Sequence, residues 1–453
     1  MAPMTAAHSP DASIAQLKAN GAVTVVGTVV NPAGLTHAKA VPIGRTNVFA
    51  DPGLGASPVW HGFTIDQTGI VFTDTTSVVG DERIRIDLTA LHGIGGGLAW
   101  APGEFFDQAG DRIPMCSRGT LGRVEARLAE AGLRALVGHE IEFVLVAADG
   151  ARIPSALWAQ YGLAGVLEHE GFVHDVMSAA AAAGVGIEQF HPEYGQNQFE
   201  ISLRPQSPVA AADHLVLMRI IVCRVARRYG LRVSLSPVPF AGSVGSGAHQ
   251  HFSLTRGRTP LFSGGPGPYG LTDDGQHAIA GLLAGLPEAQ GVLAGSILSG
   301  LRMQPGHWAG AFVCWGAENR EAAVRFLVGG RGNPQGANVE VKIVDPSANP
   351  YFATAAILGL ALDGIERGAA LPAETMVDPA LQSKSERKSA GTVQLPDRQA
   401  DVISALEGSS LMRRVLGEQA VDMTVAVRRH EHRQYGALSP EELADRFRLA
   451  WSL

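Results

Sequence analysis

Two glutamates stand two residues apart in a strongly apolar stretch of the chain. Glu140 and Glu142 lie within residues 138–146, whose remaining side chains are suited mainly to a hydrophobic core. Strand side chains alternate between faces, so both carboxylates point the same way. Buried like charges are costly unless a cation, a proton or solvent relieves them. A metal ion would best relieve the conflict, although the pair taken alone favours an edge strand whose glutamates face water.

Three more strand-like segments carry acids or imidazoles. They provide Glu193 and Glu200 in residues 191–203, His249 and His251 in residues 245–254, and Glu340 and Lys342 in residues 338–346. A carboxylate-rich set with one or two imidazoles suits Mg²⁺ or Mn²⁺, whereas a structural zinc site would call for thiolates. A single histidine is more commonly a satisfied core residue. The joint occurrence favours a shared site.

A set of arginines complements these acids. Arg302 lies in residues 299–306, while Arg320 and Arg325 precede a glycine-rich turn at residues 329–332. Guanidinium groups offer a planar fork to carboxylate and phosphate oxygens and stay charged at any working pH. Arginines combined with metal-binding acids indicate phosphoryl transfer, in which fixed cations neutralise the transferring group. Ordinary surface ion pairing is the alternative, above all for Arg325.

These segments together resemble the glutamine synthetase family. The matching motifs are G-x-E-x-E-F at residues 138–143, E-x-x-x-G-Q-x-E at 193–200, G-x-G-x-H-x-H-x-S at 245–253, N-R-x-x-x-x-R at 319–325, and E-V-x-x-x-D-P-x-A-N-P-Y at 340–351. Asn197 fills the usual glycine position of the second motif. Five ordered motifs make coincidence very improbable. The match runs from about residue 115 to the C-terminus, and the preceding part resembles the family only loosely.

The resemblance implies two divalent ions, Mg²⁺ or Mn²⁺, in each site. One ion would be held by Glu142, Glu193 and Glu200. The other, which meets the nucleotide phosphates, would be held by Glu140, His249 and Glu340.

It also implies residues that contact the substrates. His251 and Ser253 would contact ATP, and Arg302 would bind the main-chain carboxylate of glutamate with Gly245 lining the same pocket. Arg320 and Arg325 would stabilise the transferred phosphate, and Lys342 stands where an arginine normally does so. The implied chemistry is formation of γ-glutamyl phosphate followed by attack of an amine.

Trp308 departs from the family pattern at a position of chemical consequence. Ammonia-using members carry a glutamate there, which attracts ammonium and deprotonates the nucleophile. An indole offers neither a base nor a negative charge, but its apolar face packs on alkyl carbon and attracts cations weakly. The Phe-Asp-Gly-Ser-Ser segment of the ammonium site is also missing from residues 49–57. We therefore expect an amine that carries carbon; packing filler in an ordinary family member is the alternative for Trp308.

The sequence leaves the amine open. The neighbours of Trp308, residues 307 and 309–311, carry no negative charge, which favours an ethanolamine-like monoamine over a polyamine unless distant residues supply the acids. The expected function is ATP-dependent ligation of glutamate and an organic primary amine to a γ-glutamyl amide. The alternatives are a conventional ammonia-using glutamine synthetase and an inactive member acting as a scaffold or nitrogen sensor.

The predicted fold class is α+β. A small β-grasp-like N-terminal domain is expected over residues 1–111, followed over residues 112–453 by a glutamine synthetase-type catalytic domain in which helices surround an antiparallel sheet funnel. Strand character is strong at residues 22–30 and 84–88. Helices are predicted at residues 14–19, 121–130, 173–183, 208–229 and 441–451 and after Asn349.

Composition fits a cytoplasmic enzyme with small-molecule substrates. A net charge of −7 with mixed signs argues against nucleic acid binding, and three cysteines suggest no disulfide framework. The N-terminus lacks the features of a secretion leader, and Pro287 and Glu288 make residues 281–301 a poor membrane span. By resemblance we expect a homo-oligomer, a dodecamer. Because residues 372–394 contain no tyrosine, control by adenylylation is not expected.

Overall fold

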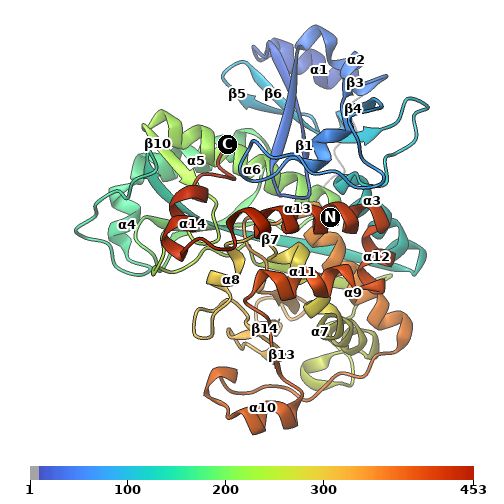
Figure 1. Ribbon diagram of the computed structural model, residues 1–453, viewed down its shortest axis with the longest axis vertical. Helices are drawn as coiled ribbons and strands as arrows, with labels where there is room; N and C mark the ends of the chain where they lie inside the picture. Colours follow the sequence, from blue (N-terminus) through green and yellow to red (C-terminus); the bar gives the residue numbers. More distant parts are fainter. Residues whose placement is uncertain (1–9) are drawn as a thin grey trace.

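A computed structural model describes residues 10–453 and confirms the α+β class. The chain forms two sheets, and helices pack beside each of them. The N-terminal sheet lies at one end of the molecule (Figure 1). The first nine residues, which bear on the expected absence of a leader and belong to the predicted 1–111 domain, lie outside the described residues. We propose residues 1–111 and 112–453 as the two domains, one around each sheet.

The N-terminal sheet is mixed and has the strand order β2-β1-β6-β4-β3, with β5 paired to β6. Its strands are β1 (Thr24–Val30), β2 (Thr36–Pro42), β3 (Leu54–Ala56), β4 (Glu82–Ile86), β5 (His92–Gly95) and β6 (Leu98–Phe106). β1 and β6 run parallel. The helices here are α1 (Pro10–Ala19) and α2 (Thr46–Ala50). Alternate residues of the strands, among them Val25, Val29 and Ile84, pack with Phe49 into a separate small core.

The second sheet holds most of the predicted chemistry. Its order is β16-β13-β14-β15-β11-β7-β9-β8, with β10 paired to β7 and β12 to β11. The strands are β7 (Leu133–Ala147), β8 (Ile187–Pro192), β9 (Gln198–Leu203), β10 (Leu231–Ser234), β11 (Gln250–Arg256), β12 (Thr259–Pro260), β13 (Phe312–Ala317), β14 (Ala322–Leu327), β15 (Asn338–Val341) and β16 (Val393–Gln394). Its pairings are antiparallel except that of β13 with β14, which is parallel.

Helices surround this sheet, and the predicted ones form within a few residues of their expected limits. The α-helices that follow the N-terminal sheet, predicted or not, are α3 (Ser117–Glu130), α4 (Leu163–Glu168), α5 (Glu170–Ala182), α6 (Pro208–Arg228), α7 (Asp273–Leu293), α8 (Ser299–Arg302), α9 (Pro350–Arg367), α10 (Lys384–Ala390), α11 (Gln399–Glu407), α12 (Ser410–Leu416), α13 (Glu418–Tyr435) and α14 (Pro440–Phe447). Pro208 and Pro350 occupy first helical positions, where a missing N–H costs nothing. α7 continues through Pro287. Among residues 10–453, no helix is both long and apolar enough to cross a bilayer.

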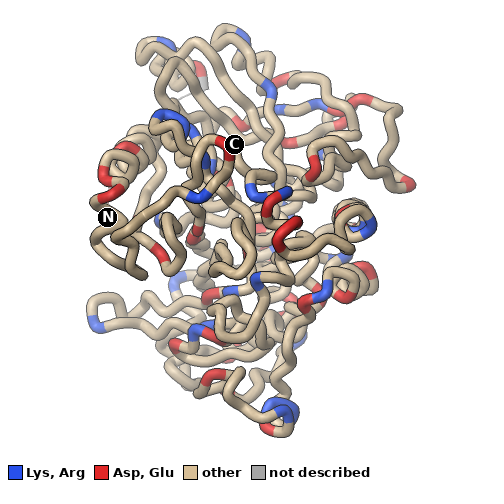
Figure 2. The backbone as a smooth tube through the Cα atoms, turned by 60° about the vertical axis from the view of Figure 1, so that its left-hand side comes forward, with Lys and Arg blue, Asp and Glu red and all other residues tan. Residues whose placement is uncertain are grey.

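Charged residues are distributed over both sheets and their helices, and Figure 2 shows acidic and basic positions interspersed along the chain.

One buried group of charged residues lies at the junction of the two sheets. The Arg118 guanidinium on α3 bonds Asp87 and Glu104 of the N-terminal part at 2.8 and 2.5 Å, and Asp213 of α6 at 2.9 Å. Because a buried guanidinium needs such partners, this contact ties the two parts together.

Asn349 makes a second tie between the two parts of the chain. Its side-chain oxygen accepts from the backbone of Tyr351 at 3.0 Å and so caps α9. Its amide nitrogen donates to the carbonyls of Val30 and Asn31, each at 3.0 Å. One short side chain therefore begins the central helix of the larger part and holds the end of β1.

Candidate active site

Strand β7 lies at the centre of the site. Glu142 stands directly opposite Glu200 of β9, and Glu140 opposite Ser202. On the other edge of β7, the Glu140 amide donates to the His249 carbonyl at 2.9 Å and the Glu142 amide to the Gly247 carbonyl at 3.0 Å. The backbone pairing of β7 with both neighbours thus brings side chains from distant parts of the sequence onto one face.

Glu140, His249 and Glu340 form one compact donor group, with potential ligand atoms within 4.8 Å of one another. His249 Nδ1 lies 3.3 Å from Glu140 Oε2 and 3.3 Å from Glu340 Oε1. All three side chains are largely buried. Two carboxylates and one imidazole at this spacing suit a hard divalent ion.

Glu142 and Glu200 join His249 in a second donor group, and Glu200 also groups with Glu193 and His191. His191 Nε2 is 3.2 Å from Glu200 Oε1, and its Nδ1 is 3.7 Å from Glu193 Oε1. Glu200 therefore belongs to both groups and links Glu142 with Glu193. His191, two residues before Glu193 in the sequence, adds an imidazole that the motif comparison did not single out.

The protonation states of the two donor groups differ. Burial and the charge of Lys342 lower the pKa of His249 to about 4, so its imidazole is neutral, as a metal ligand must be. Burial opposes ionisation of Glu340, but Lys342, His249 and His251 lower the pKa of its carboxyl to about 2. By contrast, burial and the charges of Glu200 and Glu193 raise the pKa of Glu142 to about 8. Glu142 holds a proton at neutral pH unless a cation compensates for its neighbours.

Metal binding at Glu142 is therefore expected to release a proton. Below pH 8 the proton competes with the ion, so apparent Mg²⁺ affinity should rise with pH and level off above about pH 8. Isothermal titration of the metal-free protein with Mg²⁺, in two buffers of different ionisation enthalpy, measures this proton directly. An affinity independent of pH from 6 to 8, with no buffer dependence, would contradict the assignment of Glu142 as a ligand.

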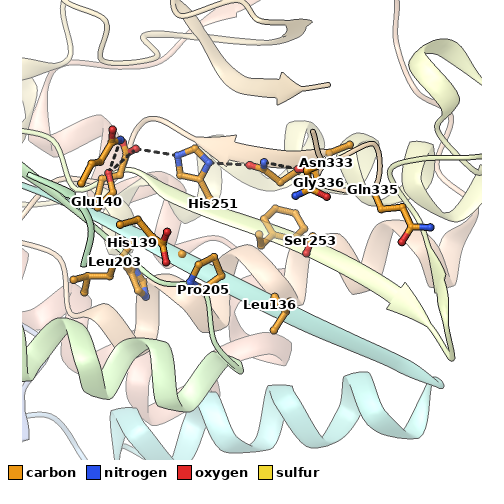
Figure 3. A pocket seen from close by; sticks show the side chains of 17 residues that line it. Leu136, His139, Glu140, Leu203, Pro205, His251, Ser253, Asn333, Gln335 and Gly336 are labelled. Atoms are coloured by element: carbon orange, nitrogen blue, oxygen red, sulfur yellow. Dashed lines mark hydrogen bonds and ion pairs between the residues drawn. The ribbon is translucent and has the colours of Figure 1, made fainter. Parts of the chain in front are cut away.

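A pocket of about 390 Å³ opens beside the first donor group. Glu140, His251 and Ser253 line it together with the segment 333–338, and His251 lies between Glu140 and that segment (Figure 3). His251 Nδ1 is 2.8 Å from Asn338 Oδ1, and its Nε2 is 3.4 Å from Glu140 Oε1. Burial opposes protonation, but Glu140 and Glu340 raise the pKa of His251 to about 9. A cationic imidazole thus faces a pocket that can take an anionic ligand.

Two of the predicted phosphate-binding cations border the same group. Lys342 Nζ lies 3.0 Å from Glu340 Oε1, and Arg325 Nη1 donates to Glu340 Oε2 at 3.2 Å. Arg325 also bonds Glu318 at 2.7 Å. Arg320 is different, since it lies exposed in the turn between β13 and β14. The sheet brings Lys342 and Arg325 to the metal donors and leaves Arg320 at the rim.

Arg302 lies buried at the end of α8, next to the donor groups. Its Nη2 donates to His249 Nε2 at 3.2 Å and to the Lys342 carbonyl at 3.1 Å. Its Nη1 donates to the Ile343 carbonyl at 3.1 Å. A side chain at Gly245 would stand 2.8 Å from the Arg302 side chain, and one at Gly247 would stand 2.6 Å from His249 Nε2. Glycine at these positions lets the backbone pass close to both groups.

Trp308 lies in an exposed turn beyond α8 and is 41 % exposed. Its ring packs edge-on against Tyr194, with ring centroids 5.3 Å apart. Tyr194 directly follows Glu193, so the indole borders the carboxylate cluster. The sequence offered no signal for this contact, because the two residues lie on segments far apart in the chain.

Gln198 is another residue that the motif comparison did not assign. Its amide nitrogen donates to Glu142 Oε2 at 3.0 Å and to the Gly245 carbonyl at 2.9 Å. Asn197, just before it, adopts a positive φ of 56°. Asparagine tolerates this conformation better than most residues, so it can replace the family glycine there. Gln198 stands two residues before Glu200 and so shares its face of the strand, and this spacing could have indicated from the sequence that Gln198 belongs to the site.

Comparisons with known proteins agree with this geometry. Residues 114–444 match the family model described as glutamine synthetase, catalytic domain. A gamma-glutamylpolyamine synthetase of Streptomyces coelicolor is 38% identical over 96% of this chain and 94% of its own length. A glutamine synthetase of Pyrococcus abyssi is 32% identical over 66% of this chain and 68% of its own. A solved structure described as a novel glutamine synthase homolog aligns with a TM-score of 0.85 at 28% identity, covering 95% of this chain and 99% of that one.

The family model covers most of the chain, including every strand of the sheet that bears the carboxylates. The relative from Streptomyces extends the match over nearly the whole length, the N-terminal sheet included. Sequence, fold and the arrangement of acids around β7 therefore lead to one assignment: the chain belongs to the glutamine synthetase family and is a carbon-nitrogen ligase of that family.

Proposed function

We propose that the protein joins the γ-carboxyl group of glutamate to an organic primary amine with the hydrolysis of ATP to ADP and phosphate. The observation that carries this proposal is the position of Trp308, an aromatic side chain beside the carboxylate cluster where ammonia-using relatives carry a glutamate. The identity to a gamma-glutamylpolyamine synthetase supports it and favours a polyamine over a monoamine.

The reaction proceeds in two steps. An oxygen of the glutamate γ-carboxylate attacks the terminal phosphorus of ATP, and ADP leaves. The amine nitrogen then attacks the acyl carbon, the bond to the phosphate oxygen breaks, phosphate leaves, and the nitrogen gives up one proton. Phosphorylation is needed because a free carboxylate has no leaving group.

The residues divide these tasks. Glu142, Glu193 and Glu200 would hold one divalent ion, and Glu140, His249 and Glu340 the other. When bound, the two ions supply positive charge to the nucleotide phosphates and the transferring group. His251 and Ser253 would contact ATP from the pocket wall.

The cations act on the substrates directly. Arg325 and Lys342 would stabilise charge on the transferred phosphate, with Arg320 reaching in from the rim. Arg302 would bind the glutamate carboxylate beside Gly245. Both of its terminal nitrogens donate to the backbone of residues 342 and 343, which holds the guanidinium in place beside the pocket.

We further propose a cytoplasmic location and a homo-oligomer, a dodecamer by family resemblance. A conventional glutamine synthetase is the second candidate, favoured by the identity to the enzyme from Pyrococcus. Loss of activity in a scaffold or sensor is disfavoured by retention of all six metal-ligand candidates.

A screen of amines tests the proposal. Phosphate release from ATP and glutamate should be fastest with an organic amine, and mass spectrometry should find the corresponding γ-glutamyl amide. Ammonia outpacing every organic amine would establish the conventional activity. No ATP turnover with any amine would favour the inactive alternative.

A further inference from the structure

An exposed aromatic pair borders the carboxylate cluster. Tyr194 and Trp308 are 40% and 41% exposed, and their rings meet at 62° with centroids 5.3 Å apart. The Tyr194 amide donates to Glu193 Oε2 at 2.8 Å, which fixes this ring next to a metal-ligand candidate. The faces of such rings accept both alkyl chains and cations.

Glu321, directly before β14, contacts the turn that carries Trp308. Its Oε1 accepts from the Trp308 amide at 3.1 Å, and Trp308 holds a φ of 50°, a conformation that bulky residues rarely adopt. The hydrogen bond thus keeps the Trp308 turn in a strained position. Glu321 is only 8% exposed, and its second oxygen is buried with no hydrogen-bond partner among residues 10–453.

The surroundings of Trp308 are acidic although its neighbours in the sequence are not. Asn319 donates to the carbonyls of Thr375 and Val377 at 2.8 and 3.0 Å, which holds the segment before Asp378 against the turn that carries Glu321. Burial raises the pKa of Glu321, and the charge of Asp378 adds to that effect. Glu321 therefore brings an acid to the turn that carries Trp308, from a segment that does not adjoin Trp308 in the sequence.

Building on the proposed function, we infer that Tyr194 and Glu321 determine which amine this enzyme uses, and that they select a diamine or polyamine. Tyr194 completes with Trp308 a surface for the methylene chain. Glu321 is a positioning residue that holds Trp308 through one oxygen, and its negative charge favours a second ammonium group above the rings.

The physical argument rests on charge and burial. A buried carboxylate oxygen without a donor is costly, and a nearby cation reduces that cost. A diamine brings a second ammonium group to the aromatic pair, and a monoamine does not. Opposite charges attract more strongly near a protein surface than in bulk water, so this ammonium group gains from the Glu321 carboxylate.

Butylamine and 1,4-diaminobutane make a matched pair of probes, since they share four carbons and differ in one ammonium group. With wild-type enzyme, the diamine should have the lower KM. Glu321→Gln keeps an acceptor for the Trp308 amide but removes the charge. It should raise the KM of the diamine about tenfold, equivalent to about 1.4 kcal/mol, and leave that of butylamine within about twofold.

Further variants separate position from charge. Tyr194→Ala should raise the KM of both amines, whereas Tyr194→Phe, which keeps the ring, should not. Glu374→Gln is the control, because Glu374 also accepts a backbone N–H in this region, from Ala317 at 2.8 Å, but lies outside the amine surface. KM values for ATP and glutamate should stay unchanged in all four variants.

The outcomes are distinguishable. If Glu321→Gln changes neither amine, or changes both equally, Glu321 has only a structural role and the inference is overturned. If Tyr194→Ala leaves both KM values unchanged, the aromatic surface does not contact the amine. A wild-type enzyme that uses ammonia but neither amine overturns the proposed function and this inference together.

Discussion

Glu142→Ala is expected to lower ATP-dependent turnover by about a hundredfold or more, because a bound metal supplies several kcal/mol of charge stabilisation and each 1.36 kcal/mol is tenfold in rate. Glu142 faces Glu200 directly across the β7–β9 pair, whereas Glu140, the other carboxylate of β7, stands opposite Ser202. Phosphate release at saturating glutamate and amine, over a range of Mg²⁺ concentrations, measures the loss.

Thermal melting separates this effect from misfolding. Burial of the Glu142 carboxyl beside Glu200 and Glu193 costs free energy in the absence of metal, so the metal-free variant should melt no lower than the wild type, while stabilisation by added Mg²⁺ should diminish. Glu125→Ala is the matched control, since Glu125 on α3 accepts a backbone bond from Val209 at 3.3 Å away from the site. An undiminished rate in Glu142→Ala would remove this residue from the metal site.

Trp308→Glu is expected to change which nucleophile the enzyme uses. A carboxylate at this position would attract ammonium and accept its proton, so kcat/KM for ammonia should rise about tenfold or more, given the size of general-base effects. Loss of the indole removes apolar contact with the alkyl chain, and kcat/KM for the preferred organic amine should fall about tenfold. Competition between ammonia and that amine, followed by mass spectrometry, reports both changes at once.

Trp308→Gln provides the matched control for this change. It removes the ring as Trp308→Glu does but adds no charge, so it should lose organic amine use without gaining ammonia use. If both variants behave like the wild type with both nucleophiles, Trp308 does not contact the amine. If Trp308→Gln gains as much ammonia use as Trp308→Glu, the gain comes from space and not from the carboxylate.

The sequence was most informative where strand alternation decides direction. Glu140 and Glu142 were expected on one face of a strand, and both group with His249 from that face of β7. The expected pairing of Glu340 and Lys342 on one face likewise agrees with the 3.0 Å contact between their charged groups. Such short-range geometry follows from the two-residue repeat of a strand and needs no tertiary information.

Contacts between distant segments could not be read in this way. Tyr194, Trp308 and Glu321 come from three different turns, and their meeting depends on how β8–β9, α8 and β14 are placed by the sheet. The absence of acids beside Trp308 in the sequence favoured a monoamine, whereas the fold supplies Glu321 from the turn between β13 and β14. Helix α10 was also not predicted; a capping box formed by Ser383 and Glu386 begins it within a polar segment.

The two-part role of Asn349 changes what the family signature can be used for. This asparagine belongs to the D-P-x-A-N-P-Y motif, yet every bond described for it holds backbone at the seam between β1 and α9. A homologue without catalytic activity would still need this asparagine to hold β1 against α9. When genomes are surveyed for active ligases of this kind, that motif identifies chains with this fold. The carboxylates around β7 are the residues that indicate catalytic activity.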